Sequence, residues 1–326
     1  MKRKTIFLYL AMVSLLVQGQ PTAKYYQGAD GKRQYALKTA LSEIIKPHTN
    51  VGYAGLLEAY KTTDRRADGK VWDMYSDMTN FTFDVDKAGS YKKEGDVYNR
   101  EHSVPASWFN NASPMYSDLF HVYPTDGYVN NRRGNYPFGE NKGEKYKSHN
   151  SFCKLGACTV SGYTGICFEP NDEYKGDFAR SYFYMATCYE DKISSWDSDM
   201  FSGDNTTCFK SWALQMLLRW SREDPVSQKE IDRNNAVETY QHNRNPFIDF
   251  PGIEQYIWGT HTSRTFSSTG YVSPWATGID EIPATQETVR SLVIVYDLGG
   301  RKVQTGGTDG LKPGIYIVNG KRIYVN

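Results

Sequence analysis

The 326-residue chain carries 38 Lys and Arg against 37 Asp and Glu, and 39% of its residues are hydrophobic. These fractions are typical of a globular protein, so they exclude disorder as a description of the whole chain. The net charge of +1 creates no overall positive potential that would attract a polyanion. A polyanionic ligand would therefore have to be held by a local basic patch or by a metal ion.

The first 19 residues have the pattern of a secretory signal peptide. Lys2, Arg3 and Lys4 precede an apolar run from Ile6 to Val17, and Val17-Gln18-Gly19 forms a small-residue cleavage site. The run is short of the roughly 20 residues that a bilayer span needs. We therefore expect an exported protein, secreted, periplasmic or on the cell surface, with no membrane span.

Hydrophobic periodicity predicts an α+β body that is mostly helical. Helical spacing is expected over residues 35–46 and 53–60, and alternation predicts half-buried strands over 70–76 and 81–85. The strongest helix patterns cover residues 177–196, 211–223 and 227–243. The second of these is apolar nearly all round, so we expect it to be buried, and the third should begin after Asp224-Pro225.

The composition changes near residue 270. A linker over residues 266–278 is expected to lead into a small β-rich domain at 279–326, leaving residues 20–265 as the catalytic body. Leu292–Asp297 and Gly314–Val325 read as short strands, and Asn319-Gly320 is a strong hairpin signal. This tail is too small to carry a separate active site.

Five cysteines lie in the middle third of the chain. Their odd number leaves at least one unpaired within the chain, and the spacing of Cys153, Cys158, Cys167, Cys188 and Cys208 contains no Cys-x-x-Cys motif. The sequence does not decide how they pair, and no oligomer is implied.

Two neighbouring segments carry the residues that phosphodiester hydrolysis requires. The first contains Glu101 and His102, and the second runs from Ser117 to Gly139, with Pro124 as the expected start of a helix. A neutral histidine suits the abstraction of a proton from water, and a hard divalent ion prefers oxygen ligands. Arginines can hold a phosphate with paired hydrogen bonds. His102, Glu101, Asn130, Arg132 and Arg133 supply these parts.

These segments resemble the endonuclease I family of secreted bacterial nucleases, which has a ββα-metal (His-Me finger) active site. The resemblance extends over about residues 24–262 through Lys70-Val-Trp-Asp-Met-Tyr-Ser-Asp, Phe168-Glu-Pro, Tyr174-Lys-Gly-Asp-Phe-Ala-Arg, Trp220-Ser-Arg-Glu-Asp-Pro and Arg244-Asn-Pro-Phe-Ile-Asp. It implies a fold built around that motif, and an endonuclease that leaves 5′-phosphate ends.

The resemblance also implies a role for each motif residue. His102 is the expected general base, Glu101 and Asn130 are the expected ligands of one Mg²⁺ (or Mn²⁺ or Ca²⁺), and Arg133 is the expected phosphate contact. The chain departs from enterobacterial-type members at Leu119-Phe120-His121, where they read Leu-His-Asn. His121 therefore stays open between orienting the site and serving as an ordinary core histidine.

Strand geometry qualifies this assignment. Neighbours in a strand point to opposite faces, so Glu101 and His102 reach one phosphate only if the strand ends or bulges there. Pro105 makes an early strand end plausible. Glu169, Asp177 and Arg180 match another family segment, and we expect structural roles for them, whereas His48, His149, His242 and His261 have no motif context.

Basic residues outnumber acidic ones beside the second segment, as Arg132, Arg133, Lys142, Lys145 and Lys147 stand against Glu140 and Glu144. This excess could follow a nucleic-acid backbone, although a solvated loop gives the same pattern. The tail, from about Gly278, resembles the C-terminal sorting modules of Bacteroidetes exported proteins through Val295–Val303 and Leu311–Val318. That resemblance implies export machinery as a partner; otherwise the tail is a small docking domain.

The sequence thus predicts an exported, metal-dependent endonuclease acting on DNA with little sequence preference, and it leaves open whether RNA is also a substrate. A peptide-bond metallohydrolase is poorly supported, because the chain has neither His-Glu-x-x-His nor Gly-x-Ser-x-Gly. A secreted, non-catalytic carbohydrate- or protein-binding module, with tyrosines and tryptophans lining its groove, is the remaining alternative.

Overall fold

The computed structural model describes residues 23–275 except Ala88, and in the tail residues 294–296, 302–305, 311, 314–318 and 321–325. The chain divides into two compact units, Met1–Ala276 and Thr277–Asn326. The expected signal peptide lies outside the described residues. None of the described helices is long and apolar enough to cross a membrane.

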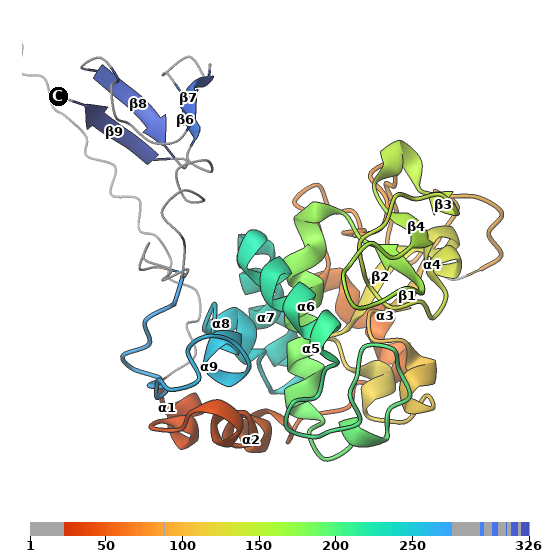
Figure 1. Cartoon of the computed structure of the whole chain (residues 1–326). Coiled ribbons are helices and arrows are strands. Elements are labelled where there is room, and N and C mark those ends of the chain that lie inside the picture. Colours follow the sequence, from red (N-terminus) through yellow and green to blue (C-terminus); the bar gives the residue numbers. More distant parts are fainter. Residues whose placement is uncertain are drawn as a thin grey trace, which may run out of the picture. The chain divides into compact units, whose positions relative to one another are not determined.

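The first unit combines helices with two small sheets (Figure 1). Its helices are α1 (Ala23–Tyr26), α2 (Gln34–Ile45), α3 (Gly52–Thr63), α4 (Gly127–Arg133), α5 (Lys175–Cys188), α6 (Ser211–Glu223), α7 (Gln228–Gln241), α8 (Pro246–Asp249) and α9 (Glu254–Ile257). Its strands are β1 (Tyr98–His102), β2 (Val122–Asp126), β3 (Tyr146–Lys147), β4 (Lys154–Ala157) and β5 (Ile166–Glu169). The α+β class expected from the sequence is confirmed.

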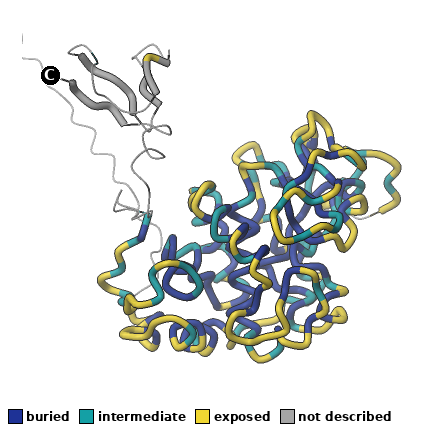
Figure 2. Tube along the Cα trace, viewed as in Figure 1, coloured by how far each residue is buried: buried dark blue, intermediate teal, exposed yellow. Residues whose placement is uncertain are grey.

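Helix α5 is the central element of the first unit. Every residue from Gly176 to Cys188 is buried, and the tube of Figure 2 is dark along this helix. Helix α6, which the sequence predicts to be buried all round, instead buries one face through Trp212, Met216 and Trp220 and leaves Gln215 exposed. The prediction of a fully buried α6 is therefore wrong, and α5 occupies that position.

Helix α7 begins where the sequence predicts. Ser227 accepts a hydrogen bond from the Glu230 amide, and the Glu230 side chain accepts one from the Ser227 amide. This capping box satisfies two backbone donors that the helix cannot pair internally, and such caps contribute about 1 kcal/mol.

The strands predicted over residues 70–76 and 81–85 are absent from the structure. This stretch is a loop held by side-chain hydrogen bonds, with Asp73 accepting from the Tyr75 amide at 2.8 Å and from the Thr79 hydroxyl at 2.8 Å. Val71, Tyr75 and Phe81 are buried nonetheless. The apolar alternation therefore reflects a packed loop, and a period of two in so short a segment did not distinguish it from a strand.

The segment after residue 265 packs against the same unit. The Phe266 ring contacts Phe250 in an edge-on arrangement, and the Phe266 amide donates to the Lys32 carbonyl at 2.8 Å. Tyr271 also contacts Phe250. The packed body therefore extends beyond residue 265 to at least residue 271.

The second unit contains β6 (Ile294–Tyr296), β7 (Lys302–Thr305), β8 (Gly314–Val318) and β9 (Lys321–Val325), in the sheet order β7-β6-β8-β9. Val318 pairs with Lys321 across β8 and β9, as a two-residue hairpin requires. The predicted strands of the tail are confirmed.

All five cysteines are free thiols in the structure. Cys158 and Cys167 are close enough to hydrogen bond to each other, and this contact lowers the pKa of Cys158 to about 7. Burial raises the pKa values of the Cys153 and Cys188 thiols.

Candidate active site

A β-hairpin followed by a short helix carries the predicted site residues. Strand β1 pairs antiparallel with β2, from Tyr98 opposite Asp126 to His102 opposite Val122, and α4 follows β2 directly. Pro124 therefore lies inside β2 opposite Arg100 and does not begin the helix, so that expectation is wrong. The ladder tolerates a proline, which has no N–H to donate, because the Arg100 carbonyl opposite it faces away from β2 and accepts from the Asn130 side chain at 3.4 Å.

Asp126 is the residue that begins α4. Its Oδ1 accepts from the Val129 amide at 2.8 Å, which is an N-cap, and its Oδ2 accepts from the Gly95 amide at 2.7 Å. The helix ends at Gly134, which has a φ of 55° that glycine adopts without strain. The seven-residue helix is thus fixed at both ends.

Side chains of α4 bind the edge of β1 that faces away from β2. The Asn130 amide nitrogen donates to the Arg100 carbonyl at 3.4 Å, and Arg133 Nη1 donates to the His102 carbonyl at 2.7 Å. These two carbonyls are two residues apart, so they point to the same side of the strand. The contacts bring Asn130 and Arg133 beside Glu101 and His102.

Glu101 is 2% exposed and is paired with Arg133. Its Oε1 accepts from Arg133 Nη1 at 2.5 Å and from the Tyr75 hydroxyl at 2.8 Å. Burial raises the pKa of this carboxyl, and Arg133 opposes that rise. Both bonds use Oε1, so Oε2 has no hydrogen bond from the described residues and keeps its lone pairs.

Arg133 is 1% exposed, with every guanidinium nitrogen bonded. Nε donates to the Tyr136 carbonyl at 3.1 Å and Nη2 to the Ser103 carbonyl at 2.7 Å, in addition to the Nη1 bonds to Glu101 and His102. The structure therefore brings Arg133 to the site but turns its donors to protein groups. In this arrangement four of its five N–H donors bind protein groups, and its burial keeps a phosphate from reaching it.

His102 lies at the last position of β1, where the strand ends. Its Nε2 is 3.0 Å from the Tyr116 carbonyl. Because a carbonyl only accepts, Nε2 carries the proton and Nδ1 keeps the lone pair. Burial, together with the nearby charge of His121, lowers the pKa of His102 to about 3, so the ring is neutral at ordinary pH.

Glu101 and His102 point to opposite faces of β1, as the strand geometry predicts. Glu101 faces Tyr75 and Arg133, whereas the His102 ring stacks on Tyr116, with centroids 4.9 Å apart and planes inclined by 24°. One substrate group reaches both residues only where β1 ends.

His121 is fully buried, and its ring centroid is 5.6 Å from that of His102. Its Nε2 bonds the Met115 carbonyl at 2.7 Å, while Nδ1 is buried without a hydrogen-bond partner. Burial lowers the pKa of His121 to about 4. It therefore packs as a neutral ring behind His102.

The oxygens of Glu101 and Asn130 suit a hard divalent cation. The Asn130 side-chain nitrogen donates to the Arg100 carbonyl, so Asn130 Oδ1 has no hydrogen bond from the described residues. Glu101 Oε2 has none either. One carboxylate and one amide oxygen resemble the few protein ligands through which Mg²⁺ is usually held, water and phosphate supplying the rest. The donor set therefore fits such an ion.

Comparison with known proteins identifies the family. Residues 33–252 match the family model described as Endonuclease I. The extracellular ribonuclease of Bacillus amyloliquefaciens is 34% identical over 252 residues, covering 75% of this chain and 81% of the relative. The chain belongs to the endonuclease I family.

Two other relatives are similar over different spans. The extracellular ribonuclease of Bacillus subtilis (strain 168) is 34% identical over 258 residues, covering 76% of this chain and 84% of the relative. The periplasmic deoxyribonuclease of Aeromonas hydrophila is 26% identical over 137 residues, covering 41% and 48%. The names of the endonuclease I relatives thus include both ribonucleases and deoxyribonucleases, which supports a nuclease activity for the family.

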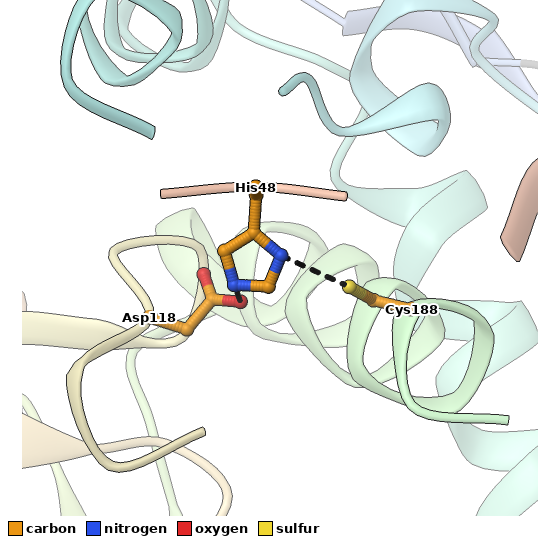
Figure 3. A group of neighbouring side chains, drawn as sticks. All are labelled: His48, Asp118 and Cys188. Atoms are coloured by element: carbon orange, nitrogen blue, oxygen red, sulfur yellow. Dashed lines mark hydrogen bonds and ion pairs between the residues drawn. The ribbon is translucent and has the colours of Figure 1, made fainter. Parts of the chain in front are cut away.

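A second group of possible metal ligands lies away from the hairpin. His48, Asp118 and Cys188 place their ligand atoms within 4.8 Å of one another, with His48 between the other two (Figure 3). However, His48 Nδ1 is 2.8 Å from the Lys46 carbonyl and must carry a proton. Asp118 accepts from the Tyr184 and Tyr189 hydroxyls and from Gln241. These groups are already bonded as a core network.

The Asp118 network connects the segment before β2 to α5 and α7. Burial alone would raise the pKa of Asp118, but His48, His121 and the hydrogen bonds outweigh it and hold the pKa below its usual value. This buried carboxylate therefore fixes the loop from which β2 starts.

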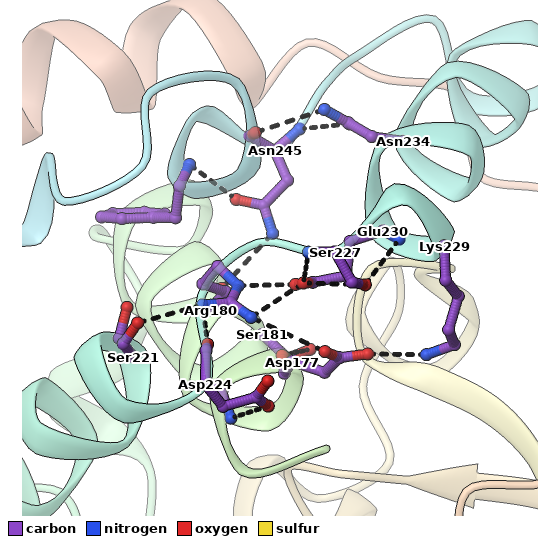
Figure 4. Close-up of polar contacts among 12 residues, drawn as sticks. Asp177, Arg180, Ser181, Ser221, Asp224, Ser227, Lys229, Glu230, Asn234 and Asn245 are labelled. Atoms are coloured by element: carbon purple, nitrogen blue, oxygen red, sulfur yellow. Dashed lines mark hydrogen bonds and ion pairs between the residues drawn. The ribbon is translucent and has the colours of Figure 1, made fainter. Parts of the chain in front are cut away.

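A second buried network joins α5 to α7 (Figure 4). Arg180 donates to both oxygens of Glu230, at 2.5 and 2.8 Å, and Asp177 accepts from Lys229 at 2.6 Å. The structural roles predicted for Asp177 and Arg180 match these contacts. Glu169 likewise pairs with Lys154 and Lys175.

A cavity of about 520 Å³ lies on other elements, lined by Trp72, Asp73, Asp77 and Tyr174 among others. None of the predicted site residues lines it. The predicted site residues instead meet at the hairpin and α4.

Proposed function

We propose that this protein is an exported, divalent-metal-dependent endonuclease that hydrolyses phosphodiester bonds of DNA and RNA with little sequence preference. The observation that carries the proposal is that a neutral His102 with an unbonded Nδ1, and Glu101 and Asn130 with one unbonded oxygen each, meet at the end of β1, where α4 contacts the strand. The names of the relatives, extracellular ribonuclease and periplasmic deoxyribonuclease, support both the substrate class and the location.

His102 is the proposed general base. Its Nδ1 takes a proton from water, the water oxygen bonds to phosphorus, and the bond from phosphorus to the 3′ oxygen breaks, leaving a 5′-phosphate and a 3′ oxygen that takes its proton from solvent. A divalent ion bound by Glu101 and Asn130 would neutralise charge on the phosphate and on the departing oxygen. The Tyr116 carbonyl keeps His102 in the tautomer that can accept the proton.

Arg133 is proposed as a positioning residue. It holds Glu101 through Oε1 and the end of β1 through the His102 and Ser103 carbonyls. This pairing orients the remaining Glu101 oxygen, and the charge of Arg133 opposes the rise in the Glu101 pKa that burial causes. The role differs from the phosphate contact expected from the sequence.

Exposed basic residues near α4 are proposed to contact the nucleic-acid backbone. Lys145 and Lys147 are exposed and form no ion pair with the described residues, and Arg132 lies over the Tyr128 ring. The Tyr146 ring, on β3, lies 6.3 Å from that of Tyr128, so the basic segment runs beside the site. We further propose that the C-terminal unit engages export machinery, which its separate fold permits without affecting the site.

Incubation of the full chain with plasmid DNA and with a structureless RNA tests the proposal. We expect cleavage of both with Mg²⁺, none with EDTA, and ends that a ligase joins without prior phosphorylation. Intact substrates from folded protein with Mg²⁺, Mn²⁺ and Ca²⁺ would reject the nuclease proposal. A non-catalytic binding module would then be the better account.

A further inference from the structure

Arg100 differs from the other arginines of the buried core. Arg133, Arg180, Arg233 and Arg244 each pair with a carboxylate, namely Glu101, Glu230, Asp64 and Asp249. Arg100 is half-buried, and no acidic group among the described residues forms an ion pair with it. Cations that are removed from water are usually paired with an acidic group. The half-buried guanidinium of Arg100 has no such partner among the described residues.

Arg100 also has an unused donor. Nη1 donates to the Tyr53 carbonyl at 3.1 Å, whereas Nε is buried and has no hydrogen-bond partner. Among the described buried side-chain atoms that lack a partner, Nε is the one that belongs to a cationic group. Leaving a donor of a charged group unsatisfied costs more than leaving a neutral one, so an acceptor is expected there.

The position of Arg100 connects it to the candidate active site. It precedes His102 by two residues on β1, so both side chains lie on the same face of the strand. Its guanidinium carbon is 3.7 Å from the centroid of the Tyr53 ring, and that ring stacks at 4.6 Å on Tyr116, which in turn stacks on His102. A continuous stack therefore links the free cation to the proposed base.

We propose that Arg100 is a substrate-binding residue that contacts a backbone phosphate of the nucleic acid, adjacent to the bond that His102 serves. A phosphodiester supplies the missing negative charge and an acceptor for Nη2, which among the described residues has no bond and, unlike Nε, is not fully buried, and a guanidinium binds phosphate oxygens with its outer donors. Stacking on Tyr53 holds the planar group in place before the substrate binds. This inference rests on the proposed nuclease function and assigns to Arg100 the contact that the buried Arg133 does not offer.

Salt-dependent binding tests this assignment. The full chain carrying His102→Ala, in EDTA, is titrated against a short fluorescent single-stranded oligonucleotide at several salt concentrations. Adding Arg100→Ala should weaken binding about tenfold, and the slope of log K against log salt should fall by about 0.7, the value for one phosphate contact on a single strand. Arg100→Lys should restore the slope and part of the affinity, because it returns the charge without the planar fork.

Arg222→Ala provides the matched control, because Arg222 is an exposed arginine on α6. It should change neither affinity nor slope by a measurable amount. Arg100→Gln guards against misfolding, since it keeps a long polar side chain. An unchanged slope in folded Arg100→Ala or Arg100→Gln protein overturns the inference, since a merely structural arginine would alter stability but not the number of phosphates neutralised.

Cleavage by the wild-type chain distinguishes a failure of the Arg100 inference from a failure of the proposed nuclease function. If it cleaves nucleic acid while the Arg100 variants bind like their parent, the Arg100 inference fails and the proposed function stands. If the wild-type chain does not cleave and the His102→Ala parent shows no salt-dependent binding, both fail together.

Discussion

The Tyr116 carbonyl accepts a hydrogen bond from His102 Nε2 at 3.0 Å. This one contact decides which ring nitrogen can act as a base, because the protonated Nε2 leaves the lone pair on Nδ1. The same residue stacks on the His102 ring. Tyr116 thus fixes both the tautomer and the orientation of the proposed base.

Replacement of Arg133 should damage both stability and activity. Arg133→Ala leaves the Glu101 carboxylate buried without its partner, which costs about 3–5 kcal/mol of the free energy of unfolding. Chemical denaturation measures this loss. Arg133→Lys should lose less stability, because it keeps the charge, yet its activity should still fall, since a single ammonium cannot bind Glu101 and both strand carbonyls.

The kinetic pattern of Arg133→Gln, which removes the charge that Arg133→Lys keeps, tests the positioning role. If Arg133 holds Glu101, replacing it by Gln should lower kcat and leave the salt dependence of KM unchanged. A lower salt dependence of KM with kcat intact would instead assign Arg133 to the substrate phosphate.

Acidification should destabilise the protein through His121. Burial lowers its pKa to about 4 in the folded chain, whereas an unfolded histidine titrates near about 6.5. Between these values the unfolded state binds more protons, so this contribution to stability is present above about pH 6.5 and falls as the pH drops toward 4, by up to about 1.4 kcal/mol per pH unit.

The comparison with His121→Asn isolates that contribution. Buried carboxyls such as Asp73, whose pKa burial raises to about 7, titrate in the opposite sense, so the wild-type curve alone is a sum. The difference in unfolding free energy between wild type and His121→Asn should shrink from pH 7 to pH 4.5. A difference that is constant with pH would show that folding does not lower the pKa of His121.

Replacement of Asp118 should destabilise the fold without touching the proposed chemistry. Asp118→Ala removes the acceptor of the Tyr184 and Tyr189 hydroxyls and of Gln241. Several buried donors are then unsatisfied at about 1–3 kcal/mol each, so a loss of at least about 3 kcal/mol is expected by denaturation. Metal analysis of wild type distinguishes this network from a metal site: zinc retained with unit stoichiometry and lost in Asp118→Ala would contradict it.

Local sequence signals predicted much of the helical body. Ser227 with Glu230 marks the start of α7, and the spacing of Trp212, Met216 and Trp220 predicts α6 to within its ends. These features depend on residues within a few positions of one another. The Glu101-His102 pair and Asn130 were singled out from two short segments and their family resemblance, and the hairpin and α4 bring these residues together.

Contacts between distant segments could not be predicted in this way. The burial of Arg133 depends on Glu101 and Ser103, some thirty positions away, so local spacing singled out Arg133 but did not reveal that its donors bind protein groups. The free donor of Arg100 was missed for the same reason, although its place two residues before His102 on a strand was a usable signal. Pro124 suggested a helix start, but β1 makes it part of a hairpin.

The cleavage rate of folded His102→Ala protein tests the assignment of His102 as the general base. The full chain, His102→Ala and the control His149→Ala, which replaces an exposed histidine paired with Asp77, are incubated with supercoiled plasmid and Mg²⁺, and initial rates are measured. Loss of a general base predicts a rate lower by about 10²–10⁴-fold for His102→Ala, with His149→Ala close to wild type. Cleavage by His102→Ala within a few-fold of wild type would contradict the assignment of the base.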